Sequence, residues 1–166
     1  IVVNDTCESS VPGVYAVGDV NGGPQFTYVS LDDFRIVFGA LTGNGQYTLK
    51  DRKNIPYTTF LTPPLSRVGL TEEDAINQGY TVKTKEMLVA TMPRAHVNDY
   101  LKGAFKIVVD ADNDLILGAT LYSQGAEELI NLIKMAMDNN IPYTYFKNQI
   151  FTHPTMAENL NDLCNF

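Results

Sequence analysis

The segment Gly103–Ser123, GAFKIVVDADNDLILGATLYS, constrains the fold more than any other part of the chain. Phe105, Ile107 and Val109 stand at every other position of its first half, so they share one face of an extended strand. The polar run DADND then supplies turn-forming residues. The second half has apolar residues at every other position: Leu115, Leu117, Ala119 and Leu121. This pattern predicts an antiparallel β-hairpin with one buried face.

The next segment, GAEELINLIKMAMDNN from Gly125 to Asn140, changes to helical periodicity. Asn139 and Asn140 suit the left-handed position that ends many helices, and Pro142 prevents continuation. Apolar residues recur three or four positions apart and form one stripe: Leu129, Leu132, Ile133, Ala136 and Met137. We therefore expect an amphipathic helix directly after the hairpin.

Shorter elements flank these two. The stretch TTFLTPPLSRVGL predicts two extended pieces interrupted by Pro63 and Pro64. TEEDAINQGY predicts a helix with Thr71 as N-cap, TVKTKEMLVA predicts a strand, and Thr155–Leu163 predicts a short helix. Strands and helices do not alternate regularly, so we expect an α+β fold, an antiparallel sheet with flanking helices.

The N-terminal part has a different pattern. Two short apolar runs, Ile1–Val3 and Val14–Val17, precede a helix expected from Phe26 or Thr27 to Gly43, and TGNGQYTLKDRKN then interrupts the apolar pattern. The expected apolar face of this helix consists of Phe26, Val29, Val37 and Ala40, with Phe34, Phe38 and Leu41 beside them. The chain is therefore expected to comprise residues 1–43, a linker at 44–56 and a domain at 57–166.

Composition excludes several function classes. A net charge of −7 disfavours nucleic acid and anionic membrane surfaces as partners. No apolar run approaches the length of a bilayer span. The first residue is Ile and no signal peptide is present, which we interpret as a piece of a longer protein. Cys7 and Cys164 show no disulfide or metal-binding spacing, so we expect a reducing cytoplasm.

The stretch IFTHPTMAENL holds the first candidate for chemistry. Thr155 and Glu158 have the spacing of a capping box, and on that interpretation His153 is a surface residue before a helix. Alternatively, Glu158 lies one helical turn along, where its carboxylate can orient the His153 imidazole for proton transfer. The spacing alone favours the capping box.

The stretch YAVGDVNGG holds the second candidate. Gly18 would let the backbone approach a ligand, and Asp19 could accept hydrogen bonds from ligand hydroxyls. The helix start at Gln25, Phe26 and Thr27 would present backbone amides to an electron-rich group. An ordinary strand end and turn explains the same residues, so composition leaves the choice open. With His96 and His153 as the only histidines and no paired acids at ligand spacing, no metal site is expected.

Three motifs together resemble the flavoprotein disulfide reductases, the family of glutathione reductase, lipoamide dehydrogenase and mercuric reductase. SVPGVYAVGDV is similar to their last flavin-contacting segment, FLTPPLSRVGLTEEDA to the start of their dimerisation domain, and IFTHPTMAE to its closing signature. Their order and separation also fit, and the resemblance covers essentially the whole chain. PPLSRVG and FTHPTMAENLNDL resemble bacterial members tied to defence against reactive chlorine.

The resemblance implies specific roles. Asp19, beside Gly18, would hydrogen-bond the ribityl chain of FAD, and backbone amides around Phe26 and Thr27 would face the flavin ring. His153 would be the acid–base group of a redox-active thiol pair, oriented by Glu158 and placed by Pro154. The histidine would serve the opposite subunit, so the resemblance implies a homodimer that acts on a disulfide or small-molecule substrate, with NADH or NADPH as co-substrate.

Residues 1–43 would then be the last strand and helix of an FAD-binding domain, and 57–166 the dimerisation domain. The redox cysteines and the glycine-rich dinucleotide motifs are absent from the chain, so it should be inactive alone. Two alternatives are a non-catalytic dimerisation module, in which His153 and Glu158 only cap a helix, and a small-ligand binding domain that uses the Asp19 segment.

Overall fold

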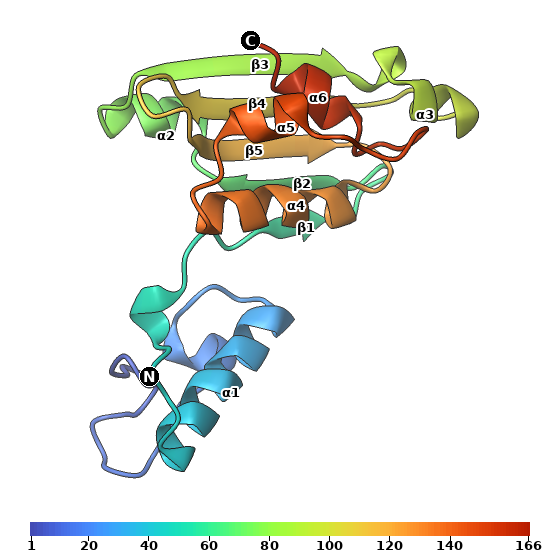
Figure 1. Cartoon of the computed structure of the whole chain (residues 1–166). Helices are drawn as coiled ribbons and strands as arrows, with labels where there is room; N and C mark the ends of the chain where they lie inside the picture. Colours follow the sequence, from blue (N-terminus) through green and yellow to red (C-terminus); the bar gives the residue numbers. More distant parts are fainter. The chain divides into compact units, whose positions relative to one another are not determined.

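A computed structural model describes all residues, 1–166, and shows two compact units, Ile1–Lys53 and Asn54–Phe166 (Figure 1). None of its helices combines the length and the apolar content that crossing a bilayer would require.

The second unit contains a five-stranded sheet in the order β1-β2-β5-β4-β3, and every neighbouring pair is antiparallel. The strands are β1 (Tyr57–Thr59), β2 (Leu65–Gly69), β3 (Val82–Leu88), β4 (Ala104–Asp110) and β5 (Ile116–Tyr122). The predicted hairpin forms β4 and β5 at the centre of the sheet, and the expected α+β fold is confirmed.

One detail of the hairpin differs from the prediction. Val108 pairs with Gly118 and Val109 pairs with Ile116, so Leu117 is an extra residue in β5. Such a bulge reverses the alternation of side chains. Ile116 is therefore buried in place of Leu117, which is half-buried, whereas Ala119 and Leu121 keep the predicted inward direction.

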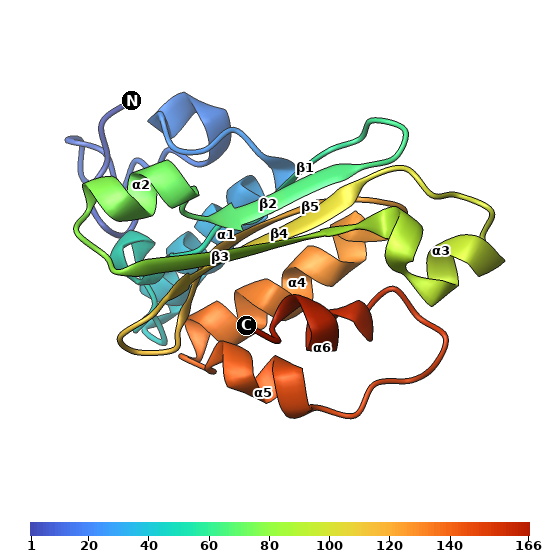
Figure 2. The same ribbon diagram turned by 90° about the horizontal axis from the view of Figure 1, so that it is seen from above.

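Helices α4 (Ala126–Asp138), α5 (Tyr143–Asn148) and α6 (Asn159–Leu163) lie on one side of this sheet (Figure 2). α4 packs on β5 and β2, α6 packs on β3 and β4, and α5 packs against α6. The core between these layers is apolar, and its most deeply buried members include Phe105, Ile107, Val109, Leu121, Ile130, Ile133, Leu160 and Leu163. The predicted stripe of α4 supplies Leu129, Ile133 and Ala136 to this core, but Leu132 is exposed.

Helix α2 (Glu72–Asn77) lies on the other side of the sheet (Figure 2). As predicted, Thr71 is its N-cap, and Thr71 and Asp74 form a complete capping box. The structure adds α3 (Pro93–Val97) and α5, which the sequence analysis did not identify. The C-terminal helix is shorter than the expected Thr155–Leu163, because it begins only at Asn159, after a bend at Met156 and a turn at residues 157–158.

The first unit has one long helix, α1 (Thr27–Thr42), and two short 3₁₀ turns, η1 (Gly18–Asn21) and η2 (Leu49–Asp51). The apolar runs Ile1–Val3 and Val14–Val17 form only isolated bridges, Val3 with Ser9 and Glu8 with Tyr15.

The predicted apolar face of α1 is largely wrong. Val29, Asp33 and Ile36 are its buried residues, while the expected Phe34, Phe38 and Leu41 are exposed. The helix carries more apolar residues than residues 1–53 can cover, and the narrow stripe that includes Asp33 is the one that faces inward.

Part of the expected linker at 44–56 is packed on the first unit. The Leu49 N–H donates to the Asp5 carbonyl (2.9 Å), and Arg52 forms ion pairs with Asp32 and Asp33 of α1.

Candidate functional site

His153 and Glu158 are brought together in the loop between α5 and α6. His153 Nδ1 lies 2.9 Å from Glu158 Oε2 and 3.1 Å from Oε1. Because a carboxylate accepts, this contact places the proton of a neutral imidazole on Nδ1. The His153 side chain is 71% exposed and that of Glu158 only 15%. The carboxylate is thus largely enclosed, and Nε2 is the ring nitrogen left for an external partner.

The capping interaction between Thr155 and Glu158 forms only in half. The Glu158 N–H donates to Thr155 Oγ1 (3.2 Å), as a capping box requires. The Glu158 carboxylate, however, contacts His153 instead of returning to the Thr155 amide. The threonine therefore orders the turn while the carboxylate is available to the imidazole. The peptide between His153 and Pro154 is cis.

Two asparagines that the sequence analysis missed anchor this loop. Asn161 Nδ2 donates to the carbonyls of Phe146 (2.6 Å) and Gln149 (2.9 Å), which joins α6 to the end of α5. Asn159, only 3% exposed, donates to the Thr155 carbonyl (3.2 Å). The partners of Asn161 lie 15 and 12 residues away, in backbone that only the fold brings near, whereas Asn159 bonds back to a carbonyl four residues earlier.

The second candidate site is the turn η1 in the first unit. Gly18 is buried with φ +72°, a left-handed conformation that favours glycine, and a Cβ there would lie 2.6 Å from Ser30 Oγ. The following Asp19 is exposed. A buried glycine is therefore followed directly by an exposed carboxylate in this turn.

The expected helix start is also where the sequence placed it. Gln25 and Thr27 are exposed and Phe26 is the N-cap of α1. The Phe26 N–H donates to the Pro24 carbonyl (3.0 Å), and the Val29 and Ser30 N–H groups both donate to the Phe26 carbonyl (2.9 and 3.1 Å).

The cysteines are placed unlike a redox pair. Cys164 is fully buried in the core, and burial raises its pKa to about 12. Burial also raises the pKa of the Cys7 thiol, which is in the other unit. Both are free thiols. No cluster of three or more His, Cys, Asp or Glu side chains could hold a metal ion.

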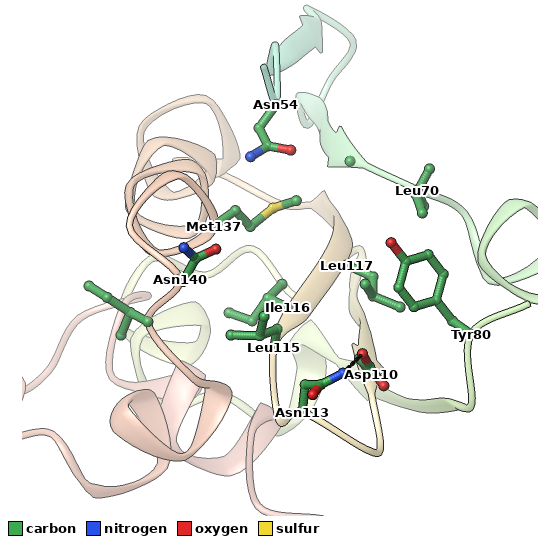
Figure 3. A pocket seen from close by; sticks show the side chains of 12 residues that line it. Asn54, Leu70, Tyr80, Asp110, Asn113, Leu115, Ile116, Leu117, Met137 and Asn140 are labelled. Carbon is green, nitrogen blue, oxygen red and sulfur yellow. Dashed lines mark hydrogen bonds between the residues drawn. The ribbon is translucent and has the colours of Figure 1, made fainter. Parts of the chain in front are cut away.

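A cavity of about 530 Å³ lies in the second unit, with Leu70, Tyr80, Asp110, Leu117 and Met137 among its lining residues (Figure 3). Two of the asparagines that line it are bonded: Asn113 Nδ2 donates to Asp110 (2.7 Å), and Asn54 Nδ2 donates to Asp138 (2.9 Å). None of the residues that line this cavity belongs to the Asp19 segment or to the His153–Glu158 pair.

Comparison with known proteins identifies the relatives of this arrangement. Residues 55–164 match the family described as "Pyridine nucleotide-disulphide oxidoreductase, dimerisation domain". The probable pyridine nucleotide-disulfide oxidoreductase RclA of Escherichia coli is 48% identical over 163 residues, which are 98% of this chain and 37% of that protein. A mercuric reductase of Lysinibacillus sphaericus is 36% identical over 160 residues, 96% of this chain and 29% of that protein.

A solved structure described as the HOCl-induced flavoprotein disulfide reductase RclA from Escherichia coli superposes with a TM-score of 0.95 at 47% identity. The match covers 98% of this chain and 38% of that one. The chain thus spans between 29% and 38% of the length of these relatives. From the fold, the motifs and these matches together, the chain belongs to the pyridine nucleotide-disulfide oxidoreductase family, and residues 55–164 form its dimerisation domain.

Proposed function

We propose that the chain is the C-terminal portion of a cytoplasmic, FAD-dependent NAD(P)H:disulfide oxidoreductase. On this proposal residues 1–43 end the flavin-binding domain, 44–56 lead out of it, and 57–166 form the dimerisation domain. The chain alone would be inactive, because the thiol pair and the dinucleotide folds belong to the remaining part of the enzyme.

The observation that carries the proposal is the His153–Glu158 contact. The carboxylate holds Nδ1–H, so Nε2 can take the proton of an attacking thiol and later return it to the departing thiolate. The resulting imidazolium is stabilised by the enclosed carboxylate. If Glu158 only capped a helix, its carboxylate would bond to the Thr155 amide. It bonds to the His153 imidazole instead, as the acid–base role requires.

The exposure of His153 agrees with action outside its own chain. An imidazole that is 71% exposed can enter a site on the partner subunit of a two-fold dimer. The family supports a homodimer, and Glu158 and Pro154 would place the ring for its partner.

The first unit supports a flavin contact of the family kind. Asp19 would bind the ribityl hydroxyls beside Gly18, and the start of α1 at Gln25, Phe26 and Thr27 would face the ring. When bound, FAD would pass reducing equivalents from the nicotinamide to the disulfide. The similarity to the HOCl-induced reductase supports a role in defence against reactive chlorine.

Rapid-reaction kinetics on the full-length enzyme test this proposal. In His153→Ala, flavin reduction by NAD(P)H should keep its rate, while the thiol–disulfide step slows by about a hundredfold or more. His96→Ala is the matched control, because the only other histidine is also exposed and its Nε2 contacts the Ala90 carbonyl instead of an acid. Unchanged disulfide turnover in His153→Ala would reject the role and favour the non-catalytic dimerisation module.

A further inference from the structure

We propose that Asp33 is the positioning residue of the flavin-facing turn: its buried carboxylate holds η1 so that Asp19 points toward the ligand. This inference rests on the proposed function of η1. It concerns a residue that neither the motifs nor the comparisons single out.

The contacts of Asp33 reach across the first unit. Its side chain is fully buried, and its Oδ2 accepts from the Gly18 N–H (2.7 Å) and from Asn21 Nδ2 (2.8 Å). Gly18 and Asn21 are the first and last residues of η1. One carboxylate oxygen therefore fixes both ends of the turn that presents Asp19.

The neighbours of the turn leave little freedom for another arrangement. Gly18 is in the left-handed region, and a Cβ there would lie 2.6 Å from Ser30 Oγ, so the Ser30 hydroxyl would have to move. Asn21 Oδ1 also accepts from the Gly23 N–H (2.9 Å), which extends the same network toward the start of α1. The anchored ends and the exposed Asp19 between them define a rigid support with one outward carboxylate.

A buried carboxylate needs a compensating charge, and Arg52 supplies it. The guanidinium donates to Asp33 Oδ1 and, through Nε, to Asp32 Oδ2 (2.7 Å). The two carboxylate oxygens of Asp33 thus have different partners. Oδ1 accepts from the Arg52 guanidinium, and Oδ2 accepts from Gly18 and Asn21 of η1. Arg52 directly follows η2 near the C-terminal end of the first unit, so this end of the unit contributes to the support of the turn.

Asp33→Asn in the full-length enzyme tests the inference, because asparagine cannot accept from both η1 and Arg52 as the carboxylate does. Asparagine has nearly the same shape, but one oxygen becomes an NH₂ group, which must face either the donors of η1 or the guanidinium. Asp32→Asn is the matched control. It removes the same charge from the same helix and also contacts Arg52, but no hydrogen bond joins it to η1.

Two measurements report the outcome. Amide hydrogen exchange of the peptide that covers Gly18–Asn21 should become at least about tenfold faster in Asp33→Asn than in Asp32→Asn. The affinity for FAD should fall by about ten- to a hundredfold in Asp33→Asn, with a shift in the absorption bands of the bound flavin. A purely structural loss would lower the melting temperature in both variants without this spectral difference.

The results distinguish the inference from the function on which it rests. Equal exchange at Gly18–Asn21 in the two variants would overturn the role of Asp33, even in an enzyme that binds FAD. If the wild-type enzyme bound no FAD, the flavin site would be wrong, and exchange alone would still decide whether Asp33 holds the turn. Should Asp33→Asn not fold, Asn21→Ala removes one donor to the same oxygen and should give the same changes at about a few-fold size.

Discussion

The two units of this chain bury different kinds of side chain. The second unit encloses a continuous apolar core between its sheet and helices α4, α5 and α6. The first unit buries only four apolar side chains, Cys7, Ala16, Val29 and Ile36, together with the carboxylate of Asp33. Several large apolar residues of α1 are exposed: Tyr28, Leu31, Phe34, Phe38 and Leu41.

The difference shows that the second unit is held by hydrophobic burial and the first by a polar network. A sheet with a covered face can be stable without further partners. The first unit instead depends on Asp33 and Arg52 to organise its turn and helix. The apolar face of α1 is exposed in this chain. This exposure fits the proposal that the rest of the flavin-binding domain, in the full-length enzyme, covers that face.

The largest effect is expected from the core of the second unit. Phe105→Ala removes a fully buried ring and should lower the free energy of unfolding by about 3–5 kcal/mol. Leu88→Ala on the neighbouring strand is the control, because Leu88 is 58% exposed and should matter little. Chemical unfolding followed by circular dichroism measures both, and similar effects of the two changes would contradict the assigned core.

Arg52→Ala should affect the first unit nearly as strongly. It leaves the fully buried Asp33 without its counter-charge, which should lower the local stability by about 3 kcal/mol. Lys50→Ala is the control, because its ion pair with Asp5 is on the surface and its loss should change stability little. Hydrogen exchange of α1 distinguishes them, and an α1 that stays equally protected in both variants would refute the network.

A smaller effect is expected from Cys164 at alkaline pH. Burial holds its pKa at about 12 in the folded chain, above its ordinary value of 9.0, so the folded state keeps a proton that the unfolded state loses. Stability should therefore fall as pH rises from about 9 to 12, by up to about 1.4 kcal/mol per pH unit. Unfolding curves of Cys164→Ala should show a weaker pH dependence than the wild type over this range, and identical slopes would argue against the burial.

The labelling rates of the two cysteine thiols report how readily each unit opens. Cys7 and Cys164 are both fully buried, so each reacts with a thiol reagent only when its surroundings open. We expect Cys7 to react first, because the first unit has few buried apolar contacts. Mass spectrometry of partly labelled protein gives the order, and earlier labelling of Cys164 would reverse the comparison.

The sequence predicted the elements whose pattern is local and strong. The hairpin around DADND, the helix after Gly125 and the Thr71 cap all have periodicity or capping signals that later packing does not override. The bulge at Leu117 could not be predicted, because one extra residue leaves the apolar composition of the strand unchanged.

The supports of the candidate sites were harder to predict than their central residues. Asp33 contacts Gly18 and Arg52 across 15 and 19 residues, and its neighbours in sequence suggest only an exposed acidic pair on a helix. Asn161 similarly binds carbonyls of a helix end that the sequence did not reveal. Long-range partners of buried polar groups become visible only once the fold places them.

The most direct test of the account uses hybrid dimers of the full-length enzyme. One subunit carries His153→Ala, and the other keeps His153 but has serine in place of the redox cysteines expected upstream. Each parent homodimer should be inactive, while the hybrid should recover about half of the wild-type disulfide turnover, because one site combines intact cysteines with the partner's histidine. A hybrid as inactive as its parents would contradict the delivery of His153 to the neighbouring subunit.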